Sequence, residues 1–283
     1  MATEIAHRSR PPALLAFGQV RYQLMLLLRS PLGFFLSIVF PLLLLICLNV
    51  ITPARPVDGL PYAQWLTPAM CAFCLLNACY VTAITSMVLA REEGILKRLR
   101  GTPLPAWAYL AGRSGSAFVT SVIASGVIIA TGLAFFHVRI VWHALGYFVA
   151  AAVLGIVCFF LLGAAVTTVV PKSESALPIA FGTMLPLAFI SDVFFSVSHP
   201  PAWLHYLSSA LPVAPIAQAM EDSFNPATQS WPMPVSGLLV VLGWSAAAIV
   251  VIALAFRWEP GPASAARGLG RSPRWPGRSR HQP

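Results

Sequence analysis

The chain has few charged residues for its length. Only 10% of its 283 residues are Asp, Glu, Lys or Arg, and 58% are hydrophobic, whereas about 25% of the residues of a soluble domain are charged. A soluble fold of this size needs more charged surface, and a disordered or disulfide-stapled chain does not need so many apolar side chains. The composition therefore predicts a polytopic membrane protein.

Charge is absent from several long stretches, and six of them can cross a bilayer. A helix needs about 20 mostly apolar residues to cross about 30 Å of hydrocarbon. The alternation typical of barrel strands is missing, so we expect an all-α protein. The predicted spans are residues 33–52, 65–90, 109–135, 145–169, 175–196 and 235–257.

Basic residues are distributed unevenly over the predicted loops. With six spans, all 18 basic residues except Arg55 and Arg139 lie on the side that holds both termini. The positive-inside rule places that side in the cytoplasm. The net charge of +9 is thus explained by topology. Nucleic-acid binding is not predicted, because it would concentrate these residues on a soluble domain.

The pattern predicts three parts. Residues 1–31 form a cytoplasmic N-terminus with an interfacial helix, since residues 13–29 are apolar but interrupted by Gln and Arg. Residues 32–257 form the six-helix transmembrane domain, with short outer-face helices between spans five and six, where prolines and aromatic residues gather. Residues 258–283 form a basic, disordered cytoplasmic tail near anionic lipid.

Cysteine is scarce, and every cysteine falls inside a predicted span. An odd number of cysteines within the membrane is not a disulfide framework. Cys71 and Cys74 have the spacing of a metal or redox pair, but no second pair follows. We therefore expect small packing residues, and we predict no metal site and no catalytic residue.

One face of the second span carries small or weakly polar residues three or four positions apart. This face is a candidate for a substrate path or a dimer face, and close helix packing is the alternative. Its candidate residues, with the neighbouring asparagine, are Thr67, Cys71, Cys74, Asn77, Thr82 and Thr85.

Asp192, near the end of span five, is a further candidate, because ionisable groups in membranes are costly and often functional; a position at the outer interface is the alternative. Pro178 and Pro186 predict that span five is kinked or broken.

The loop between spans two and three is built like a short helix. Acidic residues begin it, basic residues end it and apolar residues lie between, an arrangement that suits the helix dipole. These residues are Glu92 and Glu93, then Ile95, Leu96 and Leu99, and then Lys97, Arg98 and Arg100. A docking helix for a cytoplasmic partner and an ordinary solvated helix both fit these features.

The same loop carries a resemblance to a known family. Residues 91–105 read RExxxLKRLRxTPLP, which resembles the first cytoplasmic loop of type 2 ATP-binding-cassette (ABC) exporter permeases. ISDVFF at 190–195, PAWL at 201–204 and LPVAP at 211–215 resemble the end of span five and the outer loop of that family. The drug and antibiotic efflux branch is the one that these motifs resemble most, although the family usually has glycine where Asp192 stands.

The resemblance implies one half of an exporter's membrane domain in a bacterial cell membrane. The family's coupling helix, which sits in a groove of the ATPase subunit, corresponds to Arg91, Glu92, Glu93, Ile95, Leu96, Lys97, Arg98, Leu99 and Arg100. A working assembly has two permeases, identical or different, and two ATPase subunits. The chain lacks GxxxxGK[ST], so we expect no cofactor on it, with ATP and Mg²⁺ bound by the partner. The implied cargo is a hydrophobic or amphipathic drug, antibiotic or lipid-like molecule.

Three alternatives remain open. The first stays within the family and has a lipid-linked polysaccharide as the cargo. An intramembrane enzyme is suggested by Glu92 and Glu93 followed by Lys97, which nearly match EExxxR, but lysine lacks the forked donor of arginine. An ion-coupled carrier is disfavoured because spans one to four contain no paired ionisable residues away from their ends.

Overall fold

The described part of the chain is almost entirely helical. The computed structural model describes residues 31–52, 56–57, 59–92, 106–194 and 201–255. Within them, the only strand-like pairing is an isolated bridge between Val57 and Leu60. The elements are α2 (Pro31–Phe34), η1 (Phe35–Val39), α3 (Phe40–Ile51), α4 (Tyr62–Leu76), η2 (Asn77–Val81), α5 (Thr82–Glu92), α7 (Ala106–Phe135), η3 (Trp142–Ala144), α8 (Leu145–Val166), α9 (Ser173–Ile190), α10 (Ala202–Ala210), α11 (Val213–Asp222) and α12 (Val235–Ala255).

Within the described residues, six helices are long and apolar enough to cross a membrane, which confirms the predicted all-α fold with six spans. Spans one and two each combine two α-helical pieces around a π-helical segment, η1 or η2. The spans are Leu32–Ile51, Tyr62–Glu92, Ala117–Phe135, Trp142–Val166, Ser173–Ile190 and Val235–Ala255. Lipid offers the backbone no hydrogen bonds, so each span satisfies its own.

Span five differs from its prediction in two respects. It ends at Ile190, before the predicted residue 196, because the chain turns at Ser191 and Asp192 adopts a positive φ of 62°. This left-handed conformation is typical of the residues that end a helix. Of the predicted kink or break, the break is absent, since α9 continues through Pro178 and Pro186, and the kink stays a prediction; helices in membranes tolerate proline where neighbours satisfy the freed carbonyls.

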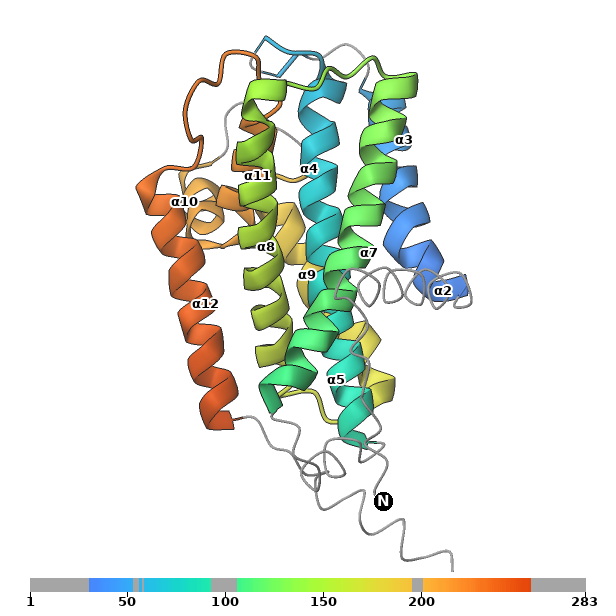
Figure 1. Ribbon diagram of the computed structural model, residues 1–283, viewed down its shortest axis with the longest axis vertical. Helices are drawn as coiled ribbons and strands as arrows, with labels where there is room; N and C mark the ends of the chain where they lie inside the picture. Colours follow the sequence, from blue (N-terminus) through green and yellow to red (C-terminus); the bar gives the residue numbers. More distant parts are fainter. Residues whose placement is uncertain (1–30, 53–55, 58, 93–105, 195–200, 256–283) are drawn as a thin grey trace, which may run out of the picture.

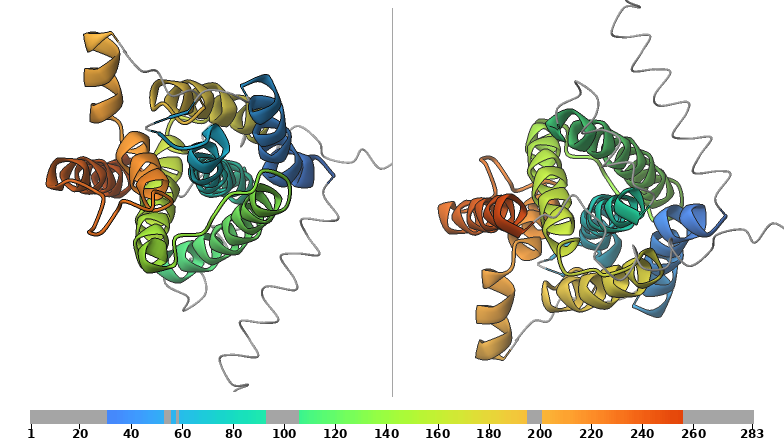
Figure 2. Two further views of the ribbon diagram at one scale, coloured as in Figure 1. Left: turned by 90° about the horizontal axis from the view of Figure 1, so that it is seen from above. Right: turned by 90° about the horizontal axis from the view of Figure 1, so that it is seen from below.

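Span two lies at the centre of the bundle. Seen along the bundle, α4 and α5 are surrounded by α3, α7, α8 and α9, whereas α12 lies outside against α8 (Figures 1 and 2). In an 18-residue apolar stretch of span two, 83% is buried within the protein, against 11% in the corresponding stretch of span six. Its small side chains allow this close approach of several neighbours.

The two helices between spans five and six differ in burial. α10 has no buried residue, whereas α11 packs against α4 and α8 and buries most of its side chains (Figure 1). The predicted interfacial helix at 13–29 and the tail at 258–283 lie outside the described residues, so the predicted three-part division stays a prediction.

Candidate functional site

The end of span two that leads into the predicted coupling segment carries two described charges. Arg91 and Glu92 are the last residues of α5. Arg91 is half-buried and Glu92 is exposed. The remaining members of the predicted coupling helix lie outside the described residues, and their role stays a prediction: Glu93, Ile95, Leu96, Lys97, Arg98, Leu99 and Arg100.

Arg91 binds the end of α8. Its Nη1 donates a hydrogen bond to the carbonyl oxygen of Thr167 at 3.2 Å, and its Nη2 donates to the carbonyl oxygen of Val170. Thr167 is the C-cap residue that directly follows α8. The last carbonyls of a helix lack partners within it and carry partial negative charge, so a guanidinium is favourable there.

Glu92 binds the start of α9. Its Oε1 accepts a hydrogen bond from the backbone N–H of Ser173 at 2.9 Å, and its Oε2 accepts one from the Ser173 hydroxyl. Ser173 is the first residue of α9, where a carboxylate complements the positive end of the helix. Adjacent charges of opposite sign thus bind two opposite helix ends. We name Arg91, Glu92, Thr167, Val170 and Ser173 the charged clamp.

Most of the predicted face of span two is inside the protomer. Thr67, Cys71, Cys74 and Asn77 are no more than 2% exposed, and the Sγ of Cys71 lies 3.8 Å from the carbonyl oxygen of Ser125 in α7. Close packing, the alternative given above, describes these four side chains in this conformation. The other two members, Thr82 and Thr85, are partly exposed, and the role of the face in a substrate path or dimer stays a prediction.

Asn77 connects the two π-helical segments. It is the first residue of η2, and its Nδ2 donates a hydrogen bond to the carbonyl oxygen of Leu36, within η1, at 2.6 Å. The hydroxyls of Tyr80 in η2 and Thr183 in α9 lie 2.9 Å apart. π-Helical turns are rare and frequently occur at functional sites. The bulge of span two is therefore fixed to both span one and span five.

The opposite end of span two is a polar cluster that the sequence analysis missed. The Nε2 of Gln64 donates to the carbonyl oxygens of Arg139 and Phe224, both at 2.8 Å, and its Oε1 accepts from the backbone N–H of Arg139 at 2.8 Å. The side chains of Tyr62 and Trp65 each donate one further hydrogen bond nearby. We name Tyr62, Gln64 and Trp65 the glutamine hub. A glutamine between aromatic residues at the start of an apolar span was the available signal.

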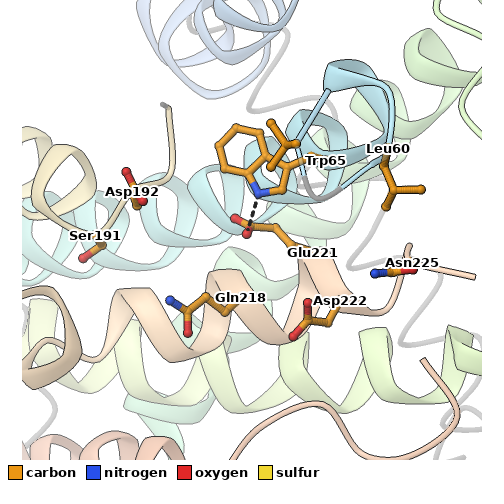
Figure 3. A pocket seen from close by; sticks show the side chains of 9 residues that line it. Leu60, Trp65, Ser191, Asp192, Gln218, Glu221, Asp222 and Asn225 are labelled. Atoms are coloured by element: carbon orange, nitrogen blue, oxygen red, sulfur yellow. Dashed lines mark hydrogen bonds between the residues drawn. The ribbon is translucent and has the colours of Figure 1, made fainter. Parts of the chain in front are cut away.

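A pocket of about 290 Å³ lies beside this hub (Figure 3). In it, the Nε1 of Trp65 donates to the Oε2 of Glu221 at 2.8 Å. The pocket is lined by Val57, Leu60, Trp65, Ser191, Asp192, Gln218, Glu221, Asp222 and Asn225. Three of these are acidic, and no lysine or arginine is among the described residues that line the pocket. The structure therefore brings Asp192 next to α11 and not to the face of span two.

Trp65→Phe is expected to lower stability by about 1 kcal/mol, because Glu221 loses a hydrogen-bond donor in a partly buried site. The measurement is the midpoint of thermal unfolding of the purified protein in detergent. Trp203→Phe is the matched control, since Trp203 lies in α10 and is 67% exposed. Equal losses in the two variants would contradict a specific role for the bond to Glu221.

The fold and these contacts define a multi-pass helical membrane protein built around its second span. Comparison with protein families identifies which one: the model of the ABC-2 type transporter family matches residues 19–225. The chain belongs to this family. A comparison with curated proteins gave no match. The chain is thus the permease subunit of an ABC exporter, a transporter subunit of a kind that typically lacks catalytic activity. Members of the family generally work with an ATP-binding-cassette subunit.

Proposed function

We propose that this permease exports a hydrophobic or amphipathic molecule of the drug, antibiotic or lipid-like class, and that a separate ATPase subunit powers it. In this proposal two permeases and two ATPase subunits form the assembly. Both termini and the coupling segment at residues 91–105 face the cytoplasm of a bacterial cell, and ATP and Mg²⁺ bind to the partner. The position of that segment carries the proposal. It directly follows span two, the span that contacts most of its neighbours.

The charge distribution of the spans supports the class of cargo. In the six described spans, Asp, Glu, Lys and Arg occur only at the ends, as Arg91, Glu92 and Glu174. Helices of this kind offer a cargo apolar surface with few fixed charges, and transfer of an apolar molecule along them avoids the cost of desolvating polar groups. A path between two such permeases suits a lipophilic cargo better than a sugar chain.

Co-purification tests the assembly. We expect the tagged chain, extracted from its own membranes in mild detergent, to carry with it a protein with a Walker motif in equal amount. Two differently tagged copies of the chain will co-purify if the permease is a homodimer. Reconstituted in vesicles, the complex is expected to move a lipophilic fluorescent dye in the presence of MgATP, and not with a non-hydrolysable ATP analogue.

Two results would overturn the proposal. Sustained dye transport by the purified chain alone would exclude a half-transporter that depends on an ATPase. Transport of a lipid-linked oligosaccharide, with no effect on any lipophilic dye, would move the cargo to the alternative class within the family.

A further inference from the structure

We propose that Arg91 and Glu92 are positioning residues that transmit movement within the permease. They bind the end of span two to the turn between α8 and α9, so that a displacement of the coupling segment reaches spans four and five together with span two. The source of this displacement rests on the proposed function, in which an ATPase moves residues 93–105. The clamp itself rests only on contacts within this chain.

The side chains of Arg91 and Glu92 both turn toward α8 and α9 of their own chain. Glu92 is the last described residue before positions 93–105 of the predicted coupling segment, and its carboxylate turns back to Ser173 in its own chain. The guanidinium of Arg91 likewise donates to the carbonyl oxygens of Thr167 and Val170. The resemblance gave both residues a role against the ATPase, but their polar atoms are engaged by the α8–α9 turn.

The partners of the two charged side chains are mostly backbone groups. An exposed pair of side chains contributes little stability, since both are free to move. In the clamp, three of the four partner groups belong to the backbone, and the two partners of Arg91, Thr167 and Val170, are only 1% exposed. Backbone groups at helix ends move only with their helices. The forked guanidinium can reach two carbonyls three residues apart, which a lysine ammonium cannot do in the same fixed geometry.

The part of span two that precedes the clamp packs on the same two helices. α5 packs on both α8 and α9. In η2, the π-helical segment directly before α5, the hydroxyl of Tyr80 forms a hydrogen bond with that of Thr183 in α9. The half of span two that ends in the clamp is therefore in contact with spans four and five along its length. The clamp ties the ends of the same three helices together, at the point where the coupling segment begins.

The first experiment uses the chain alone, without any ATPase. Thr167→Cys, in a Cys47→Ala background, places a thiol on the buried residue whose backbone carbonyl accepts from Arg91, while the other four cysteines are buried. We expect Arg91→Lys or Glu92→Gln to raise the rate of maleimide labelling at position 167 several-fold. Glu174→Gln is the matched control, because it removes the same charge from an exposed residue in the first turn of α9. Unchanged labelling in both clamp variants would overturn the clamp.

The second experiment uses the complex and measures dye transported per ATP hydrolysed. We expect Glu92→Lys to retain the ATPase subunit but to lower this ratio about tenfold, within the usual range of coupling between sites. Adding Ser173→Asp to Glu92→Lys provides a carboxylate for the new lysine and is expected to restore most of the ratio. A merely structural role would lower transport and ATP hydrolysis in proportion and leave the ratio unchanged.

Different failures are distinguishable. If Glu92→Lys releases the ATPase subunit and Ser173→Asp does not bring it back, Glu92 is an ATPase contact and the proposal is overturned. If no ATPase accompanies the unaltered chain, the proposed function fails and the transmission fails with it. The labelling experiment still decides whether the clamp exists in the lone chain.

Discussion

Gly163→Ala is expected to separate span four from span two and to destabilise the protein strongly. A Cβ at this position would lie 2.6 Å from the carbonyl oxygen of Tyr80, 2.9 Å from the Cβ of Ala83 and 3.0 Å from the Cα of Tyr80. Two of these atoms belong to the backbone of η2, which cannot rotate aside as a long side chain can. Overpacking of a dense interior costs about 1–3 kcal/mol.

The measurement is the thermal midpoint of the purified protein, together with the fraction that elutes as a single species after heating. Gly146→Ala on the same helix is the control, because a Cβ built there has no atom within 4 Å apart from its chain neighbours and the backbone of its own helix. The thermal midpoint of that variant is expected to equal or slightly exceed that of the unaltered protein, since alanine has a higher helix propensity than glycine. Equal losses at both positions would show that α8 and η2 are not in this close contact.

The position of Gly163 also shows what the sequence could not reveal. The absence of charge and the uneven basic residues were enough to predict the six spans, because hydrocarbon thickness and the positive-inside rule act on composition alone. Which spans touch is decided by the shapes of side chains. α8 is apolar on all sides, so no periodicity distinguishes the side that meets Tyr80 from the side that faces α12.

The polar residues of span two were more informative than those of the other spans. Small and polar positions three or four apart indicated either a substrate path or dimer face or a closely packed face, and four members of that face are buried within the protomer. The partners of Arg91 and Glu92, which lie 76 to 81 residues further on, depend on the fold. The charges alone predicted a helix dipole within residues 91–105 and gave no sign of α8 or α9.

Gln64 illustrates the same limit at the other end of span two. A single glutamine near the start of an apolar span is consistent with a surface position, and nothing in the sequence joins it to residues 139 and 224. In the structure it is 7% exposed and bonds to the loop before α8 and to the chain after α11. One side chain therefore connects three segments that are distant in the sequence.

Gln64→Leu is expected to destabilise the protein by about 2–4 kcal/mol, because the carbonyl oxygens of Arg139 and Phe224 and one backbone N–H lose a buried partner. Gln64→Glu keeps the size of the side chain and one acceptor for the N–H of Arg139. It replaces the donor to both carbonyls with a carboxylate oxygen, which repels them, so we expect a loss of similar size at neutral pH. Thermal midpoints in detergent measure both effects.

The comparison of the two variants separates hydrogen bonding from packing. If shape alone mattered, Gln64→Glu would be nearly neutral and Gln64→Leu would cost little, because leucine fills a similar volume with apolar atoms. Gln218→Leu is the matched control, since Gln218 lies in α11 with an exposed side chain. A midpoint for Gln64→Glu as high as that of the unaltered protein would remove the role of Gln64 as a donor. A shared loss in both Gln64 variants, absent in Gln218→Leu, would establish that this amide holds the start of span two to the loop before α8 and to α11.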